Sequence, residues 1–483
     1  MAAQRVIIIG AGLGGLQCGY VLAKNGYDVT VLEQGLQIGG CLQTYRRGNA
    51  VFDTGFHYVG GLGKGESLEW LLKYYGLDSL PWVELDRNCV DRIIIGDNSY
   101  SLSAGHGNFV DTLSTSFPAE REGLLRYVSM LKSIGDTIKS NFGTGETMPL
   151  FGMSAYDFLC ECISDPLLRR VLSGASLRLK YDRDTLPLYI FAQINNSFIQ
   201  SGWRLKGGGS VIAESLSEGI KAFGGKVITR SRVELLKETD GRITCAVDGN
   251  GNLHQGDIFI SDIHPSATLA LIPEGGSIKK VYRKRISALR NSKGVFTVNA
   301  VIKPGTLPYV NSNIYLHSED ADVWTDKGRS LMISYSVPDG GKYATNIDLL
   351  SYLDFTELEK WSDGKPMCRG EEYEAFKRAY TEDCIRFAEK AVPGLSGAIE
   401  RYYTSTSLTY RDYTATPHGS AFGIMKDWRS PLTTVLSPRT PVENLLLTGQ
   451  NLNLHGVLGV SMTSLYTCAQ ILGLDKIKKE FGI

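Results

Sequence analysis

A short run of β-branched residues that leads directly into a glycine-rich turn constrains this chain more than any other feature. Residues 6–9 read VIII, which is typical of a strand buried in a parallel sheet, and GAGLGG follows at residues 10–15. Next comes an amphipathic stretch with Gly26 placed to end a helix, and VTVL at residues 29–32 predicts a second strand before Glu33. A dinucleotide-binding βαβ unit requires this order of strand, G-x-G-x-x-G turn, helix, strand and acidic residue.

Each part of that unit has a physical task. Gly10 permits the tight turn, Gly12 lets the backbone approach a pyrophosphate, and Gly15 lets helix and strand pack closely. The helix N-terminus offers unpaired N–H groups and a positive dipole end to the phosphates. Glu33, 18 residues after Gly15, can accept hydrogen bonds from ribose hydroxyls. The turn alone does not separate FAD from NAD.

Composition narrows the class of protein further. The length of 483 residues predicts two to three domains, or one large domain with insertions. Hydrophobic residues make up 43% and charged residues 21%, as in an ordinary soluble globular protein. The chain has 51 basic and 51 acidic residues, so it lacks the basic excess typical of proteins that bind nucleic acid. We therefore expect no nucleic-acid partner.

The cysteines and the lengths of the apolar runs indicate in which cellular compartment the protein is expected. Nine cysteines include no C-x-x-C pair, so the sequence predicts reduced thiols, no disulfide framework and no metal site. The N-terminus shows no signal-peptide pattern, and no apolar run reaches the length of a membrane span. We expect a cytoplasmic protein. Six basic residues between 279 and 290 fit a solvated face or, alternatively, peripheral docking on the inner membrane face.

Two blocks after the first βαβ unit carry a family resemblance. GGCLQT at residues 39–44 and FDTGFHYVG at residues 52–60 resemble the retinol saturase branch of the phytoene desaturase and carotenoid isomerase family. The resemblance implies an α/β fold: a Rossmann-type FAD-binding domain of the glutathione reductase and amine oxidase superfamily, with a mixed α+β substrate domain. That family usually has Arg after the glycine pair, where this chain has Cys41. Arg46 or Arg47 is the expected substitute for its charge.

The resemblance continues along the chain. WRLKGGGS at residues 203–210, DIFISDIHP at 257–265, TPHGSAFG at 416–423 and LLLTGQ at 445–450 match further segments of the family, and a helix is predicted from 456 to 472. In the family, these segments surround the flavin, and the last helix points its N-terminus at the pyrimidine carbonyls. The predicted FAD-binding residues are Gly10, Gly12, Leu13, Gly14, Gly15, Glu33, Gln34, Gly39, Gly40, Cys41, Gly55, His57, Val233, Ser261, Gly449, Gln450, Val457 and Leu458.

These positions predict a discontinuous arrangement of domains. The FAD-binding domain takes residues 1–75, 203–275 and 440–483, and the substrate domain takes 76–202 and 276–439. Within the substrate domain we expect helices near 124–138, 154–172 and 371–391, and a strand at 295–302. Residues 185–203 contain no charged side chain. They fit either a core helix or the wall of an apolar tunnel for a polyene or another long lipid.

The resemblance implies an FAD-dependent oxidoreductase that acts on carbon–carbon double bonds of a polyene or isoprenoid lipid by hydride transfer through flavin N5. Saturation also needs a proton, for which His57, Tyr58, Tyr410 or water are the candidates. No second nucleotide-binding unit is visible in the sequence, so an external electron donor or acceptor is expected. The alternatives are a redox-neutral carotenoid-type isomerase and, from another class, a lipid-binding escort protein on the same fold. An amine oxidase is a weaker alternative.

Overall fold

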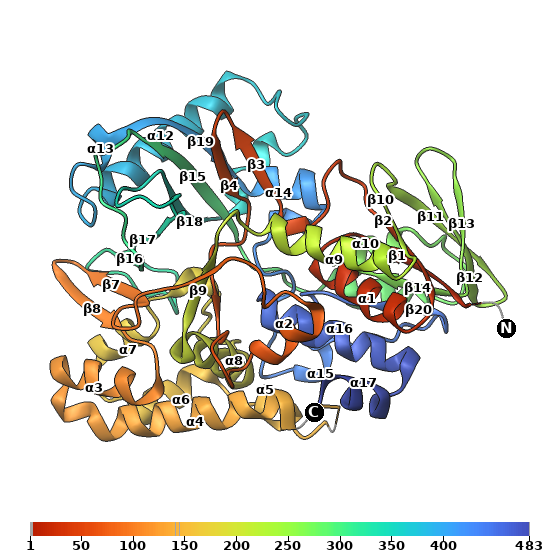
Figure 1. Cartoon of the computed structure of the whole chain (residues 1–483), viewed down its shortest axis with the longest axis horizontal. Helices are drawn as coiled ribbons and strands as arrows, with labels where there is room; N and C mark the ends of the chain where they lie inside the picture. The colour runs from red at the N-terminus through yellow and green to blue at the C-terminus, as the bar shows by residue number, and fades with distance from the viewer. Residues whose placement is uncertain (1–2, 141, 144, 483) are drawn as a thin grey trace.

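A five-stranded parallel sheet forms the centre of one half of the molecule in the computed structural model, which describes residues 3–140, 142–143 and 145–482 (Figure 1). In spatial order its strands are β10 (Lys226–Ile228), β2 (Asp28–Leu32), β1 (Arg5–Ile9), β14 (Ile258–Ser261) and β20 (Leu445–Leu447). The first βαβ unit of the sequence is therefore the core of this sheet, as predicted. All five strands come from the three segments expected to build one domain.

Side chains alternate between the two faces of this sheet. Val6 and Ile8 of β1 pack against the helices α1 (Leu13–Lys24), α9 (Ser210–Ala222) and α16 (Gly456–Leu472). Ile7 and Ile9 face the other way, onto a smaller antiparallel sheet and a short helix. The elements of that layer are β11 (Val233–Thr239), β12 (Arg242–Asp248), β13 (Leu253–Gln255) and α10 (Pro265–Ala270). This layered arrangement is the Rossmann-type α/β fold that the sequence predicts.

A second, seven-stranded sheet organises the other half of the molecule. In spatial order its strands are β19 (Ile399–Ser405), β15 (Gly294–Ile302), β18 (Asn346–Leu353), β17 (Ser330–Tyr335), β16 (Asn313–His317), β7 (Asp91–Ile95) and β8 (Asn98–Leu102). One face packs on α12 (Glu371–Ala388), and the other belongs to a core shared with α4 (Arg121–Ser140) and α8 (Leu188–Gln200). Figure 1 shows α3 to α8 gathered on one side of this sheet and α12 and α13 on the other.

The predicted helices of this half are present, with one difference. Residues 154–172 form two helices, α6 (Ala155–Cys162) and α7 (Pro166–Leu172), where one was expected. Proline disfavours the helical conformation of the residue before it, so Asp165 is extended and caps α7 through the N–H groups of Leu167 and Leu168. The uncharged stretch 185–203 forms α8 and the start of β9 (Gly202–Leu205), and both are largely buried.

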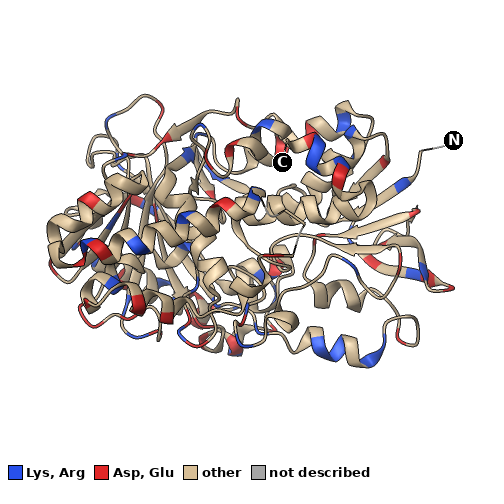
Figure 2. Cartoon of the chain, turned by 90° about the horizontal axis from the view of Figure 1, so that it is seen from below, with Lys and Arg blue, Asp and Glu red and all other residues tan. Residues whose placement is uncertain are grey.

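The surface carries charges of both signs, interspersed over the molecule (Figure 2). The basic cluster of residues 279–290 lies on and around α11 (Lys280–Ser287), where Lys279, Lys280 and Lys284 are exposed. Within the described part of the chain, no helix is both long enough and apolar enough to span a bilayer.

Candidate active site

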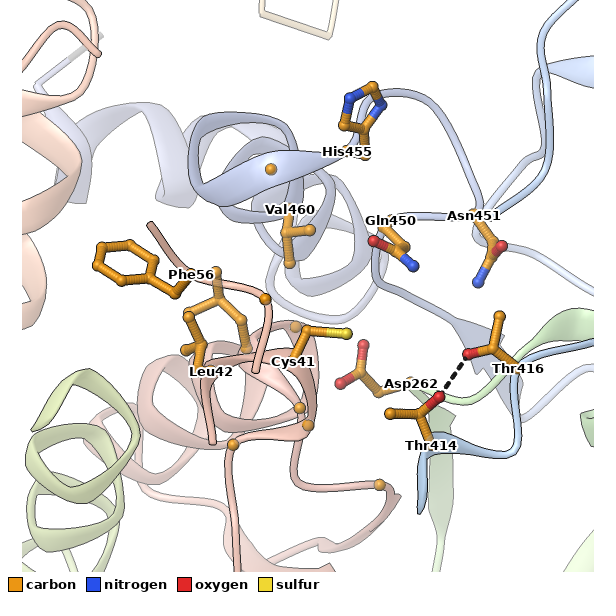
Figure 3. A pocket seen from close by; sticks show the side chains of 18 of the residues that line it. Cys41, Leu42, Phe56, Asp262, Thr414, Thr416, Gln450, Asn451, His455 and Val460 are labelled. Carbon is orange, nitrogen blue, oxygen red and sulfur yellow. Dashed lines mark hydrogen bonds between the residues drawn. The ribbon is translucent and has the colours of Figure 1, made fainter. Parts of the chain in front are cut away.

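One cavity of about 510 Å³ lies where the two halves of the molecule meet. Its wall includes the glycine turn after β1, the segment 39–43, the loop 55–60, residues 414–416 and the start of α16 (Figure 3). From the other half it receives Arg178, Ile194 and Phe198 together with Met332 of β17. A cofactor held by the glycine turn would therefore lie in the same cavity as the apolar side chains of Ile194, Phe198 and Met332.

The glycine turn is packed around a carboxylate. An added Cβ would lie 2.5 Å from Asp262 Oδ2 at Gly12 and 2.4 Å from Asp262 Oδ1 at Gly14. At Gly15 it would lie 2.1 Å from the carbonyl oxygen of Gly10, so this glycine serves the packing of helix on strand. Asp262 lines the cavity, and Figure 3 shows it between Cys41 and Thr414. Burial raises the pKa of Asp262 to about 7. A hydrogen bond from the Gly15 N–H acts in the opposite direction and lowers the pKa, but by less.

Glu33 lies at the end of β2, where the sequence places it. Its Oε2 accepts a hydrogen bond from the Ala11 N–H at 3.0 Å, and its Oε1 accepts one from the Gly35 N–H at 2.7 Å. The side chain lines the cavity beside Gln34, Arg232 and Val233. These residues form the end of the cavity that suits the nucleoside part of a dinucleotide.

The second glycine pair brings a further segment to the glycine turn. The Gly39 N–H donates to the carbonyl oxygen of Ala11 at 2.7 Å, and the positive φ angles of Gly39 and Gly40 (110° and 55°) let the chain turn there. Cys41 follows on the cavity wall. Arg46 and Arg47 lie on β3 (Thr44–Arg47) with exposed side chains and do not line the cavity, so the expectation that either replaces the family's arginine was wrong.

The start of α16 closes the opposite side of the cavity. Gln450, His455, Val457 and Leu458 line it, so the N-terminal, electropositive end of this long helix faces the space. The His455 ring packs on Phe422 with 4.4 Å between ring centroids. The His455 Nε2–H donates to the carbonyl oxygen of Arg178 at 3.2 Å, which ties α16 to the other half of the molecule.

Most predicted cofactor residues line the cavity, and three lie just behind its wall. The lining residues among them are Gly10, Gly12, Leu13, Gly14, Glu33, Gln34, Gly39, Gly40, Cys41, Gly55, His57, Val233, Gln450, Val457 and Leu458. Gly15 and Gly449 pack on the glycine turn and Asp262. The Ser261 hydroxyl is fully buried and hydrogen-bonds Thr268 Oγ1 at 2.7 Å.

The three predicted proton donors fall into two groups. His57 and Tyr58 line the cavity. Burial, and then the charge of Arg204, lowers the pKa of His57 to about 4, so its imidazole is neutral near pH 7. Tyr410 does not line the cavity, because its hydroxyl is turned to the Thr54 carbonyl oxygen, to which it donates at 2.6 Å.

The structure adds polar residues that the sequence did not single out. Asp262, Arg178 and His264 all line the cavity. Arg178 forms a buried ion pair with Asp91, 2.7 Å between Nη1 and Oδ2, and its guanidinium lies 4.6 Å from the centre of the Phe198 ring. Arg178 is one of several basic residues between 169 and 183, so the sequence offered no signal that separates it from its neighbours.

The fold and this site define a protein with a Rossmann-type dinucleotide-binding domain, as the sequence predicts. The NAD(P)-binding Rossmann-like domain family matches residues 8–75. Over 95% of the chain the fold is similar to that of an oxidoreductase from Methanosarcina mazei (TM-score 0.64, 19% identity, 99% of that chain). Over 97% it is similar to that of a putrescine oxidase variant (TM-score 0.67, 15% identity, 99% of that chain).

The resemblance to the retinol saturase branch is also confirmed. The chain is 26% identical to the all-trans-retinol 13,14-reductase of Danio rerio, over 96% of this chain and 85% of that protein. The enzyme of the same name from Homo sapiens is 24% identical, over 97% and 85%. A 4,4'-diapolycopene oxygenase from Methylomonas sp. is 25% identical over 58% of this chain and 60% of that protein.

Proposed function

We propose that this protein is an FAD-dependent reductase of carbon–carbon double bonds in a polyene or isoprenoid lipid. One observation carries the proposal: a single cavity joins a dinucleotide-binding glycine turn to an apolar wall. Similarity to all-trans-retinol 13,14-reductases over nearly the whole chain supports this substrate class.

The residues present fit FAD. The turn at residues 10–15 and the N-terminus of α1 would hold the pyrophosphate, because the glycines keep the backbone N–H groups free of side chains, and a Cβ at Gly12 or Gly14 would collide with the Asp262 carboxylate. Glu33 would accept hydrogen bonds from the ribose, and the backbone of Val233 would hold the adenine. The N-terminal end of α16 would face the pyrimidine carbonyls. Bound flavin would supply hydride transfer at N5.

The substrate part of the cavity is built for an apolar molecule. Ile194 and Phe198 of α8 line it, so the uncharged stretch 185–203 is both a core helix and a part of the wall. Met332, Leu177 and Leu454 complete this apolar surface. His57 and Tyr58 are the titratable groups beside it that a reaction at a double bond can use as acids.

Two finer assignments belong to the same proposal. Residues 1–75, 203–275 and 440–483 form the FAD-binding domain, and the other segments form the substrate domain. The parallel strands and the glycine turn of the first set support this division. The electrons come from a separate redox partner, since the G-x-G-x-x-G turn at residues 10–15 is the one such strand–turn–helix motif in the sequence.

The test is anaerobic. The purified protein is photoreduced, all-trans-retinol or a carotenoid is added, and the flavin absorbance and the product mass are followed. The expected result is flavin reoxidation together with a product heavier by two hydrogen atoms. A product of unchanged mass with the flavin still reduced would make the protein an isomerase. A preparation that neither contains nor takes up FAD would overturn the cofactor assignment.

A further inference from the structure

Five strands of the second sheet carry a row of polar side chains across one buried face. Asn299 of β15 pairs with Asp348 of β18, which pairs with Ser334 of β17, and Asn313 of β16 pairs with Asp91 of β7. A hydrogen bond of 3.3 Å from Ser334 Oγ to Asn313 Oδ1 joins the two parts. All five residues are buried. Met332, two residues before Ser334 on the same strand face, lines the cavity, so the row lies on the cavity side of the sheet.

Two buried arginines contact this row, and only one of them is paired directly with a carboxylate. Arg178 is paired with Asp91 at 2.7 Å. Arg204 of β9 donates to Asn313 Oδ1 at 2.9 Å and otherwise to neutral oxygens of Tyr309, Val310 and Ser312. A buried cation is costly unless a negative charge lies close to it. Arg204 therefore favours a negative charge on the remaining carboxyl of the row, that of Asp348.

Asp348 connects the row to the cavity through His57. Its Oδ2 lies 3.7 Å from His57 Nδ1, and its Oδ1 accepts a hydrogen bond from Asn299 Nδ2 at 2.6 Å. Both side chains are at least nine-tenths buried. His57 lines the cavity, and its Nε2 has no hydrogen-bond partner among the described residues. Such catalytic contacts are often long before substrate binds and shorten in the complex.

We propose that Asp348 supplies, through His57, the proton that saturation of the double bond requires. The inference rests on the proposed function. Bound reduced flavin would supply the hydride for one carbon of the double bond, and the other carbon would take the proton of His57 Nε2. As that N–H bond breaks, the Asp348 carboxyl gives its proton to Nδ1, so His57 stays neutral and Asp348 becomes a carboxylate. Asn299 and the charge of Arg204 stabilise that carboxylate.

The relay requires a protonated Asp348 and a neutral His57, and the surroundings of both groups favour these states. Burial raises the pKa of Asp348 to about 7, while the hydrogen bond from Asn299 and the charge of Arg204 lower it. The pKa of His57 is lowered to about 4, so its ring does not take the proton from Asp348 at rest. The other titratable groups that face Asp348 are Tyr45, Asp53 and Tyr410. Burial raises the pKa of all three, so none adds a full negative charge near pH 7.

The first test needs no substrate. Infrared difference spectra of the FAD-loaded protein, with and without ¹³C-aspartate labelling, are recorded between about pH 5 and pH 9. We expect a protonated-carboxyl band that is lost as pH rises through about 7. Asp53 and Asp262, whose pKa values are also raised by burial, absorb in the same region, so the Asp348 component is the part of the band that Asp348→Asn removes. Ser334→Ala, which changes the same row without touching His57, should retain that component. If Asp348→Asn does not fold, Asp348→Glu should shift the band instead. An Asp348 that is ionised throughout this range would overturn the proposal.

The second test follows reoxidation of the reduced flavin by all-trans-retinol. We expect Asp348→Asn to keep its FAD and lower the rate roughly 100-fold. The wild-type rate should fall as pH rises through about 7, and the variant should lose this dependence. Equal pH profiles in the two proteins would overturn the role of Asp348. If retinol and carotenoids fail to reoxidise even the wild-type flavin, the proposed function fails, while the infrared band still reports whether Asp348 holds a proton.

Discussion

The two ends of the cavity are built by different means. The dinucleotide end is made largely of backbone: at Gly12 and Gly14 even an added Cβ would collide with the Asp262 carboxylate. The substrate end is made of side chains, with apolar residues of α8 in front of a buried row that includes Asp91 and Asp348. A backbone-built site tolerates almost no added atom, whereas a side-chain-built site depends on the pairing of each polar group. The two ends should therefore fail in different ways.

The largest effect is expected from Gly12→Val. The new Cβ would lie 2.5 Å from Asp262 Oδ2, and its methyl groups would enter the space proposed for the pyrophosphate. We expect the folded variant to contain less than about a tenth of the wild-type FAD, because the phosphates lose their approach to the helix N-terminus. The flavin-to-protein absorbance ratio measures this. Gly107→Val, at an exposed glycine with no atom within 4 Å of its Cβ, is the matched control and should bind FAD normally.

The dinucleotide end of the cavity was predictable because the residues that shape it are close together in the sequence. Close approach and positive φ angles require glycine at fixed positions, so GAGLGG and the pair Gly39-Gly40 record the geometry in the sequence itself. The sequence did not reveal that Asp262 fills the inside of the turn. That contact depends on β14 lying next to β1, some 250 residues away along the chain. The expectation that Arg46 or Arg47 replaces the family's arginine failed for the same reason. Tertiary packing, which the sequence alone does not reveal, decides to which side β3 turns these two side chains.

The next largest effect is expected at the other end, from Asp91→Asn. The variant leaves Arg178 as a buried cation without its carboxylate, which costs about 3 to 5 kcal/mol of the free energy of unfolding. Urea unfolding followed by circular dichroism measures the loss. Asp136→Asn breaks the exposed pair with Lys132 and should cost less than about 1 kcal/mol. Equal losses in the two variants would show that the buried pair does not depend on its environment.

The polar row itself could not be read from the sequence. Residues 91, 299, 313, 334 and 348 are spread along the sequence, and each strand carries at least one further polar residue, so nothing in the sequence marks these five as a set. Their alignment depends on the register of five strands, which a single sequence does not specify. His57 and Tyr58, which the block FDTGFHYVG brought to attention, line the cavity, and they follow the glycine pair closely in the sequence.

His57→Asn probes the substrate end without disturbing the dinucleotide end. We expect FAD content to stay at the wild-type level and turnover to fall roughly 100-fold, since the cavity loses its proton-transferring imidazole. Anaerobic reoxidation by all-trans-retinol gives the rate. His418→Asn replaces an exposed histidine that does not line the cavity and should leave the rate unchanged. Normal turnover in the His57 variant would confine this residue to a structural role.

The smallest effect is expected from Tyr410→Phe. This variant compares a residue behind the cavity wall with His57, which lines the wall. The hydroxyl donates to the Thr54 carbonyl oxygen at 2.6 Å and lies 3.1 Å from Thr297 Oγ1. Its loss should cost about 1 kcal/mol of stability, more than the loss of the exposed Tyr343 hydroxyl in Tyr343→Phe. Because Tyr410 does not line the cavity, turnover should fall far less than in His57→Asn. A fall as large as that of the His57 variant would instead mean that the Tyr410 hydroxyl reaches the substrate after a local rearrangement. The proton would then come from the α14 side (Ser407–Thr414), and the polar row would serve stability alone.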